Sequence, residues 1–407
     1  MEKFPENFLF GVAISSHQTE GGCHNNWSEW ELKNCIELAA SSSSMSHIYS
    51  GRSFKEEAFD KKNYISGQGV DHYNKFAEDF SMAKEIGLNA LRFSIEWSRI
   101  EPEEGKWDNN ELKHYCKVIE ELKKNHIEPF VTIWHWTLPL WLSAKGGVTA
   151  RDFPFYFERL SARITETFKG MVKFYITINE PEIFSLNSYF LGKWPPQKKG
   201  IISYLNSMNK LKKAHLVSYD AIKNIDRTAS VGAALNMTSF EAHSFVGYIF
   251  KYFAKKFWND FFIEKVKDRM DFIGLNYYFH RSFLFKDKSP KNYSDMGWEL
   301  YPAGISIVLE ELKSYGKPIY ITENGLADCE DKYRGWYIKE VLKNVLNSIE
   351  SGVDVRGYFH WSLMDNFEWD KGFWPKFGLI DVDRKTMKRN IRSSAFIYRD
   401  IIERGFR

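Results

Sequence analysis

The sequence lacks an excess of either charge. Among its 407 residues, 56 are basic and 53 acidic, which leaves a formal net charge of +3. Domains that bind nucleic acid usually carry a clear basic excess, so we expect no nucleic-acid partner. No stretch approaches the roughly 18 apolar residues that a membrane span needs, so we also expect no membrane span.

Cysteine and recognisable metal motifs are scarce as well. The four cysteines form no CxxC pair, and the eleven histidines show no HExxH or similar ligand spacing. We therefore predict reduced thiols, a cytoplasmic location and no bound metal. The N-terminal residues MEKFPENFLFGV lack the apolar core of a signal peptide, which agrees with that location.

Short apolar runs recur along the whole chain, with helical patterns between them. Hydrophobic residues make up 43% of the chain, which is enough for a sizeable core. The predicted strands lie at 8–12, 90–95, 128–136, 173–179, 229–237, 271–278, 318–322 and 356–363. Strands that alternate with helices favour a closed parallel (β/α)8 TIM barrel of the α/β class, formed by 1–407 as a single catalytic domain. A doubly wound open sheet is the alternative, but no GxGxxG follows the first strand.

Two segments depart from this regular alternation. The stretch at about 13–70 is longer than one helix needs, so we expect a long, mobile loop over the barrel mouth. The stretch at about 238–270 is dense in aromatic residues with interleaved lysines. It predicts a helix that packs on the barrel or lines its mouth, with a membrane-surface or partner-binding helix as the alternative.

Two predicted strands end in a glutamate. PIYITENG at 318–325 places Glu323 at the end of an apolar strand, and FYITINEP at 174–181 places Glu180 in the same way. A carboxylate is rarely buried without a reason. A single such glutamate is more often a cap or an ion-pair partner, but two at strand ends suit the two-carboxylate hydrolysis of a glycosidic bond.

Other strand ends carry polar and aromatic residues too, and in such barrels the active site lies at those ends. The residues that follow the strands include SSHQTEG at 15–21, Glu96 and Trp97, WHW at 134–136, NYY at 276–278 and WSLMDNFEW at 361–369. Structural caps would explain one or two such ends rather than most of them. A lone histidine such as His135 is usually a core residue, and we expect Glu182 to be only a charge at a helix N-terminus.

These motifs together resemble those of the family-1 glycoside hydrolases, the retaining β-glucosidase and β-galactosidase group. The resemblance covers essentially the whole chain, and the pair ITINEP (176–181) and YITENG (320–325) carries most of it. It implies a retaining exo-β-glycosidase that acts on small β-glycosides or oligosaccharides and requires no cofactor. A transglycosylase, a silent glycan-binding protein and a scaffold protein stay as alternatives.

The resemblance also implies roles for individual residues. Glu323 is the implied nucleophile and Glu180 the implied acid/base, with a carboxyl separation of about 5 Å and a Glu180 pKa raised toward roughly 6. Arg92 and Tyr278 would support Glu323, and Asn179 would hold the sugar 2-hydroxyl. The implied substrate-binding residues are Gln18, His135, Asn276, Trp361, Glu368 and Trp369.

Glu368 narrows the expected substrate, because a carboxylate at that position would repel a phosphate group. We therefore expect an unphosphorylated glycone, with glucose first and galactose or fucose as further possibilities. The preferred sugar configuration, the aglycone preference and the oligomeric state stay open from the sequence.

Overall fold

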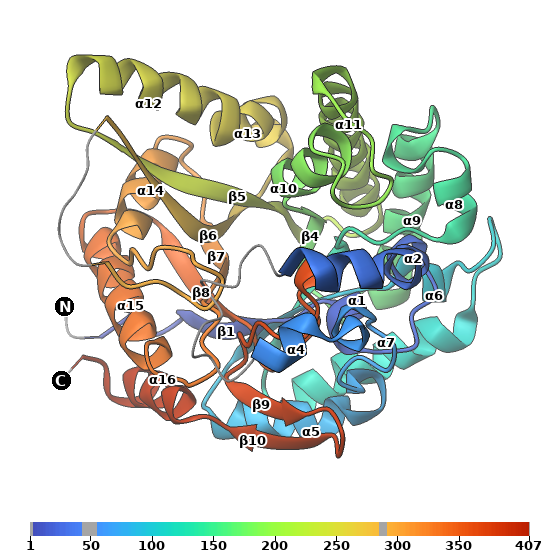
Figure 1. The fold of residues 1–407 in the computed structure, drawn as a ribbon, viewed down its shortest axis with the longest axis horizontal. Coiled ribbons are helices and arrows are strands. Elements are labelled where there is room, and N and C mark those ends of the chain that lie inside the picture. The colour runs from blue at the N-terminus through green and yellow to red at the C-terminus, as the bar shows by residue number, and fades with distance from the viewer. Residues whose placement is uncertain (1–2, 43–54, 285–290, 407) are drawn as a thin grey trace.

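In the computed structural model, which describes residues 3–42, 55–284 and 291–406, eight parallel strands close into a barrel (Figure 1). The strands are β1 (Leu9–Ala13), β2 (Ala90–Ser94), β3 (Glu128–Trp134), β4 (Phe174–Asn179), β5 (Ser230–Ala242), β6 (Phe272–Phe283), β7 (Ile319–Asn324) and β8 (Val355–Trp361). β1 pairs with both β2 and β8, which closes the sheet. The predicted strands and the (β/α)8 barrel are confirmed.

Helices surround the barrel and bury one face each against it. The longer ones are α5 (His72–Glu85), α7 (Asn109–Lys124), α9 (Phe153–Phe168), α11 (Ile201–Ile225), α14 (Gly304–Lys313), α15 (Arg334–Glu350) and α16 (Ser393–Arg404). In α7, Leu112, Ile119 and Leu122 are buried, as their helical spacing predicts. A small antiparallel pair, β9 (Ile380–Asp383) with β10 (Lys388–Ile391), lies outside the barrel.

Aromatic side chains fill the barrel near the N-terminal ends of its strands. Phe130 stacks on Phe174 with ring centroids 4.2 Å apart, and Phe359 and Tyr320 pack against Phe130. Gly11 leaves room for this cluster, because a Cβ there would lie 2.6 Å from the ring of Phe359. This cluster fills the lower part of the barrel, and the cavity with the predicted site residues lies toward the C-terminal ends of the strands.

The segment 13–70 differs from the long loop we expected. It contains α1 (Ser16–Thr19), α2 (Asn26–Ser41), α4 (Lys55–Phe59) and a 3-10 turn at Lys61–Tyr64, while residues 43–54 lie outside the described part. The side chain of Asn25 accepts hydrogen bonds from the backbone of Trp27 and Ser28, which starts α2. The expectation of a loop is therefore wrong for Asn26–Ser41, where this cap and buried tryptophans at helical spacing stabilise a helix.

The aromatic-rich segment also differs from its favoured interpretation. β5 and β6 continue pairing beyond the barrel, as far as Ala242 and Phe283, and α12 (Phe245–Trp258) follows on this arm (Figure 1). In α12 only Gly247 is buried, so the expectation that its aromatic residues pack on the barrel is wrong. That expectation holds for the next helix, α13 (Asp260–Val266), which buries Phe262 and Ile263. Across the described residues, no helix combines the length and apolarity required to cross a bilayer.

Candidate active site

A cavity of about 240 Å³ lies at the mouth of the barrel, lined by residues on or just after strands β3 to β8. The predicted site residues that line it are His135, Asn179, Glu180, Tyr278, Glu323, Trp361, Glu368 and Trp369. Arg92, Asn276 and Gln18 lie behind this lining, within hydrogen-bond distance of Glu323, Glu180 and Glu368 respectively. The structure therefore brings all the predicted residues to one mouth.

Glu323 is buried at the end of β7 and is held by two donors. The Nη1 atom of Arg92 lies 2.5 Å from its Oε1, and the hydroxyl of Tyr278 donates to its Oε2 at 3.0 Å. Burial raises the pKa of Glu323, and the charge of Arg92 is the largest effect that opposes this rise. The arrangement stabilises a negative charge on Glu323 in a place where burial would otherwise exclude one.

Glu180 lies on the opposite side of the same group of polar residues. It directly follows β4, with a φ of 40°, and Pro181 then begins α10 (Pro181–Ser185). The amide nitrogens of Asn236 and Asn276 donate to its Oε1 at 3.0 and 2.9 Å, which leaves Oε2 to carry a proton. Burial, and next the charge of Glu323, raise the pKa of Glu180 to about 8. This value exceeds the sequence-based expectation because burial contributes more than the neighbouring carboxylate.

Asn276 connects the two carboxyl groups. Its Nδ2 donates to Glu180, and the same side chain lowers the pKa of Glu323 through a hydrogen bond. Its Oδ1 accepts from Thr322 at 2.7 Å, which fixes the amide orientation. Both carboxyl groups therefore lie next to the side chain of Asn276.

Asn179 and His135 form the next layer of this network. The Oδ1 of Asn179 accepts from Nη2 of Arg92 at 2.6 Å, so its amide nitrogen is the donor to Nε2 of His135 at 3.0 Å. Burial lowers the pKa of His135 well below its usual value, and this ring is therefore neutral with its proton on Nδ1. Among the described residues that Nδ1 has no hydrogen-bond partner, so it can donate to a ligand.

Gln18 and Glu368 form a second polar side of the cavity. Gln18 accepts from the hydroxyl of Ser15 at 2.7 Å, and its Nε2 donates to the carbonyl of Phe367 at 2.7 Å and to Glu368 at 3.4 Å. Burial, and next the charge of Glu323, raise the pKa of Glu368 to about 8. The ring of His135 stacks near those of Trp361 and Trp369, so flat aromatic groups border these polar ones.

The sequence did not reveal every residue of this network. Asn236 contacts Glu180, and its signal was an isolated amide at the end of an apolar strand, as in Asn276. Glu182, expected to be a charge at a helix N-terminus, is instead buried, and burial raises its pKa well above the usual range. Its Oε2 accepts from the backbone of Asn236 at 3.4 Å, so it supports the residue that holds Glu180.

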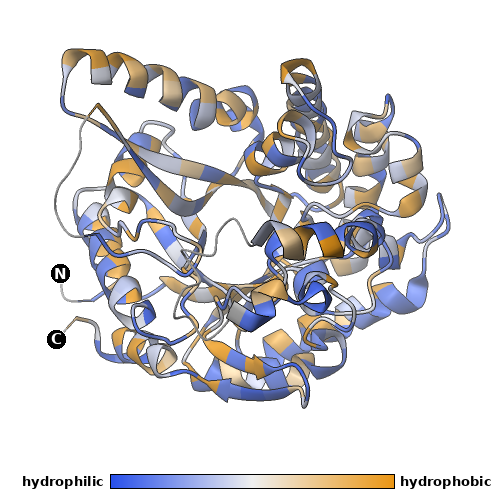
Figure 2. Cartoon of the chain, in the orientation of Figure 1, coloured by the Kyte–Doolittle hydropathy of each residue, from blue (hydrophilic) through white to orange (hydrophobic). Residues whose placement is uncertain are grey.

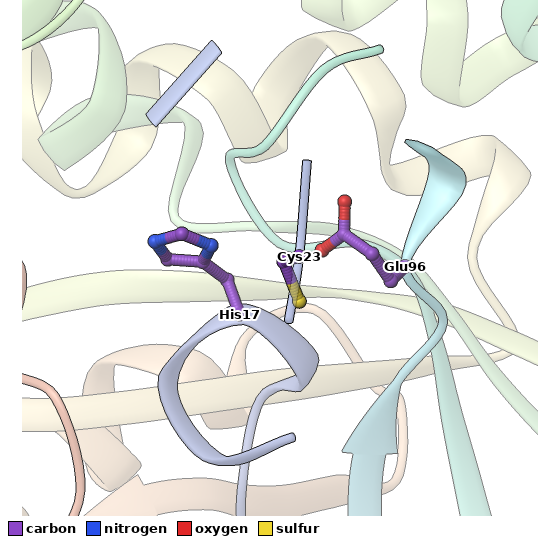
Figure 3. Close-up of side chains that lie close together, drawn as sticks. All are labelled: His17, Cys23 and Glu96. Atoms are coloured by element: carbon purple, nitrogen blue, oxygen red, sulfur yellow. The ribbon is translucent and has the colours of Figure 1, made fainter. Parts of the chain in front are cut away.

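A second cluster of side chains, His17, Cys23 and Glu96, lies beside the site, with potential ligand atoms within 4.8 Å of one another (Figure 3). The nitrogens of His17 are already bonded to Glu31 at 2.7 Å and to Asn25 at 3.1 Å. The carboxylate of Glu96 accepts from several hydroxyl groups and from Asn25. Because a metal would have to displace these bonds, the cluster supports α1, which carries Gln18, rather than forming a ready metal site.

Comparison with known proteins agrees with this geometry. The profile of glycosyl hydrolase family 1 matches residues 1–245 and 254–406. The chain belongs to glycosyl hydrolase family 1. A 1,4-beta-D-glucan glucohydrolase from Thermotoga neapolitana is 32% identical over 458 aligned residues, covering 99% of both chains. A beta-galactosidase from Sulfolobus acidocaldarius is 28% identical over 98% of this chain and 95% of its own.

Solved structures of family-1 enzymes share the fold. A beta-glycosidase from Pyrococcus horikoshii superposes with a TM-score of 0.86 at 32% identity, covering 98% of this chain and 95% of its own. A beta-glucosidase from Thermotoga maritima, solved in complex with deoxynojirimycin, has a TM-score of 0.85 at 29% identity and covers 99% of both chains. This family-1 chain is therefore a glycoside hydrolase of the β-glycosidase type.

The raised pKa of Glu180 predicts a specific pH dependence of stability. Between the unfolded-state value of 4.5 and the folded-state value of about 8, the folded chain retains a proton that the unfolded chain releases. The free energy of unfolding therefore falls as pH rises through this window. Glu180→Gln removes this loss, so the variant should exceed the wild type in stability by about 4 kcal/mol near pH 8, and by little near pH 4.

Urea unfolding at pH values from 4 to 9 measures this difference. Glu310→Gln is the matched control, because Glu310 is a solvent-exposed carboxyl on α14 and should follow the wild type throughout. A stability gap for Glu180→Gln that is constant with pH would contradict the raised pKa.

Proposed function

We propose that this family-1 enzyme is a retaining exo-β-glycosidase. It removes the terminal non-reducing β-D-glycosyl residue, glucose foremost and galactose or fucose in addition, through a covalent glycosyl-enzyme. The observation that carries the proposal is a pair of buried carboxyl groups, Glu180 and Glu323, that both lie beside Asn276. Glu323 is paired with the cation Arg92, whereas Glu180 accepts hydrogen bonds from neutral amides. We propose that these two carboxyl groups lie about 5 Å apart, the separation typical of retention.

The first step is displacement of the aglycone. The carboxylate of Glu323 attacks the anomeric carbon while Glu180 gives its proton to the glycosidic oxygen, so the C–O bond breaks and the aglycone leaves as an alcohol. Arg92 holds Glu323 in its ionised form, and burial keeps Glu180 protonated. Each group therefore begins the reaction in the protonation state that the step requires.

The second step releases the sugar. Glu180 accepts a proton from water, the water oxygen bonds to the anomeric carbon, and Glu323 leaves as a carboxylate. While Glu323 is an ester it carries no charge, so its contribution to the raised pKa of Glu180 disappears. With its pKa lowered, Glu180 stays ionised after it has given up its proton, so its carboxylate is available as the base for this half of the reaction.

The remaining polar groups bind the sugar hydroxyls. Asn179 lies beside Arg92 and Glu180, where it is placed to contact the 2-hydroxyl, and the Nδ1 of His135 is the donor left for another hydroxyl. Gln18 and Glu368 would hold a further pair of hydroxyls, and Trp361 offers a flat face to the ring. We propose that no cofactor takes part and that the enzyme acts in the cytoplasm, where its four cysteines stay reduced.

The two carboxyl groups predict two different mutant phenotypes. Glu323→Ala should lower kcat at least about 10⁴-fold, because the nucleophile is lost. Azide should partly restore turnover and give a glycosyl azide of inverted configuration. Glu180→Ala should lose most activity on an unactivated disaccharide and little on a 2,4-dinitrophenyl glycoside, whose leaving group needs no proton.

Initial rates and proton NMR of the first product formed measure these effects, with Glu310→Ala as the surface control that keeps wild-type rates. Wild-type product should appear first as the β-anomer. First product of the α-configuration would mean inversion and would contradict the nucleophile role of Glu323.

The cavity also predicts a substrate preference. Its lining includes the apolar residues Ile183, Trp194, Phe279, Met296 and Trp298, which suit an apolar or aromatic aglycone. Because the acid Glu368 offers a phosphate group no compensating positive charge, and repels it when ionised, 4-nitrophenyl β-glucoside should have a kcat/KM at least about 100-fold above that of its 6-phosphate. A panel of chromogenic glycosides measures this ratio, and equal rates on the two substrates would remove the assignment of an unphosphorylated glycone.

A further inference from the structure

The helix α12 presents its apolar side outward. The exposed side chains include Phe245 at 81%, Phe253 at 64%, Tyr248 at 60% and Tyr252 at 58%. Figure 2 shows the hydrophobic colouring along this helix at the outer edge of the molecule. A surface helix of a folded monomer normally turns such residues toward the core, so the polarity of α12 is reversed.

The lysines of α12 are engaged with the body of the same chain. The Nζ of Lys255 lies 2.6 Å from Asp260, and that of Lys256 lies 2.8 Å from the other oxygen of the same carboxylate. Lys251 is half-buried, and its charge acts on the carboxyl of Glu311. The outward face is therefore apolar, and the charges that would oppose contact with another apolar surface are compensated within the chain.

The exposed apolar area is large for a monomer. Taking about 150–250 Å² for a whole aromatic side chain, the exposed apolar side chains of α12 present on the order of 900 Å². The largest apolar patch on a typical monomer is about 300–600 Å². A stable protein interface covers about 800 Å² on each partner, which α12 supplies almost alone.

The apolar surface continues from α12 onto α11. The ring of Phe257 stacks on Tyr204 with centroids 5.8 Å apart, and beside Tyr204 the N-terminal turn of α11 exposes Ile201, Ile202 and Leu205. The family-1 profile does not match residues 246–253, the centre of this surface. The central part of the patch therefore lies outside the residues that match the family.

We propose that this surface, defined by α12 and the start of α11, binds a second copy of the chain. Two copies related by a two-fold axis would place one α12 against the other, so that each patch covers its own equivalent. The area matches what such a dimer needs, and tyrosine and phenylalanine are the residues that protein interfaces favour. A helix that binds anionic membranes would instead direct its lysines toward the lipid surface, whereas here they contact Asp260 and approach Glu311.

Sedimentation velocity of the full chain, at about 0.2–20 µM, tests this proposal. The wild type should sediment at twice its chain mass of 47.9 kDa. Phe253→Glu places a charge at the centre of the patch and should weaken dimerisation at least 100-fold, giving a monomer at 1 µM. Phe155→Glu is the matched control, because Phe155 on α9 is 60% exposed outside the patch and its variant should stay dimeric.

A single cooperative unfolding transition, and turnover of a chromogenic glycoside at the wild-type rate, verify that Phe253→Glu is folded. A monomeric wild type across this range would overturn the proposal, as would a dimer that Phe253→Glu leaves intact. Flotation with vesicles of phosphatidylcholine and phosphatidylglycerol tests whether the surface binds a membrane instead. A monomer that floats with the lipid would assign the surface to a bilayer and overturn the proposed dimer.

Discussion

The buried ion pair between Arg92 and Glu323 determines the charge pattern of the barrel mouth. A lone carboxylate at this depth would take up a proton, but the guanidinium of Arg92 beside it stabilises the ionised form. The same guanidinium donates to Thr132 and Asn179, so one residue of β2 orients groups on β3, β4 and β7. Removing Arg92 would therefore disturb both the charge of Glu323 and the position of Asn179.

The difference in protonation preference between Glu323 and Glu180 depends on the position of the Arg92 cation. Both carboxyl groups are buried, but Glu180 accepts only from neutral amides, and the negative charge of Glu323 raises its pKa further. The partners of these two similar side chains thus favour opposite protonation states. The barrel makes this possible because its parallel strands bring residues 92, 180 and 323, far apart in the sequence, to a single mouth.

Strand periodicity predicted the barrel, and polar residues at strand ends predicted the members of the site. Asn236 was missed because a single amide in an apolar strand gives no local signal of its contact with Glu180. The burial of Glu182 was missed because its position at a helix start suggests solvent, whereas its depth depends on how β5 packs beside it. The outward face of α12 was only the alternative interpretation of its sequence, because the pattern is the same whether the apolar side faces the core or another molecule.

A carboxyl NMR titration tests the central claim, the charge asymmetry of the two glutamates, most directly. With side-chain ¹³C-labelled glutamate, and Glu180→Gln to assign the signal, Glu180 should titrate near pH 8 in the wild type. In Glu323→Gln the neighbouring charge is gone, so the pKa of Glu180 should fall while burial still holds it above 4.5. A wild-type Glu180 that titrates near 4.5, or a pKa unchanged by Glu323→Gln, would contradict the account.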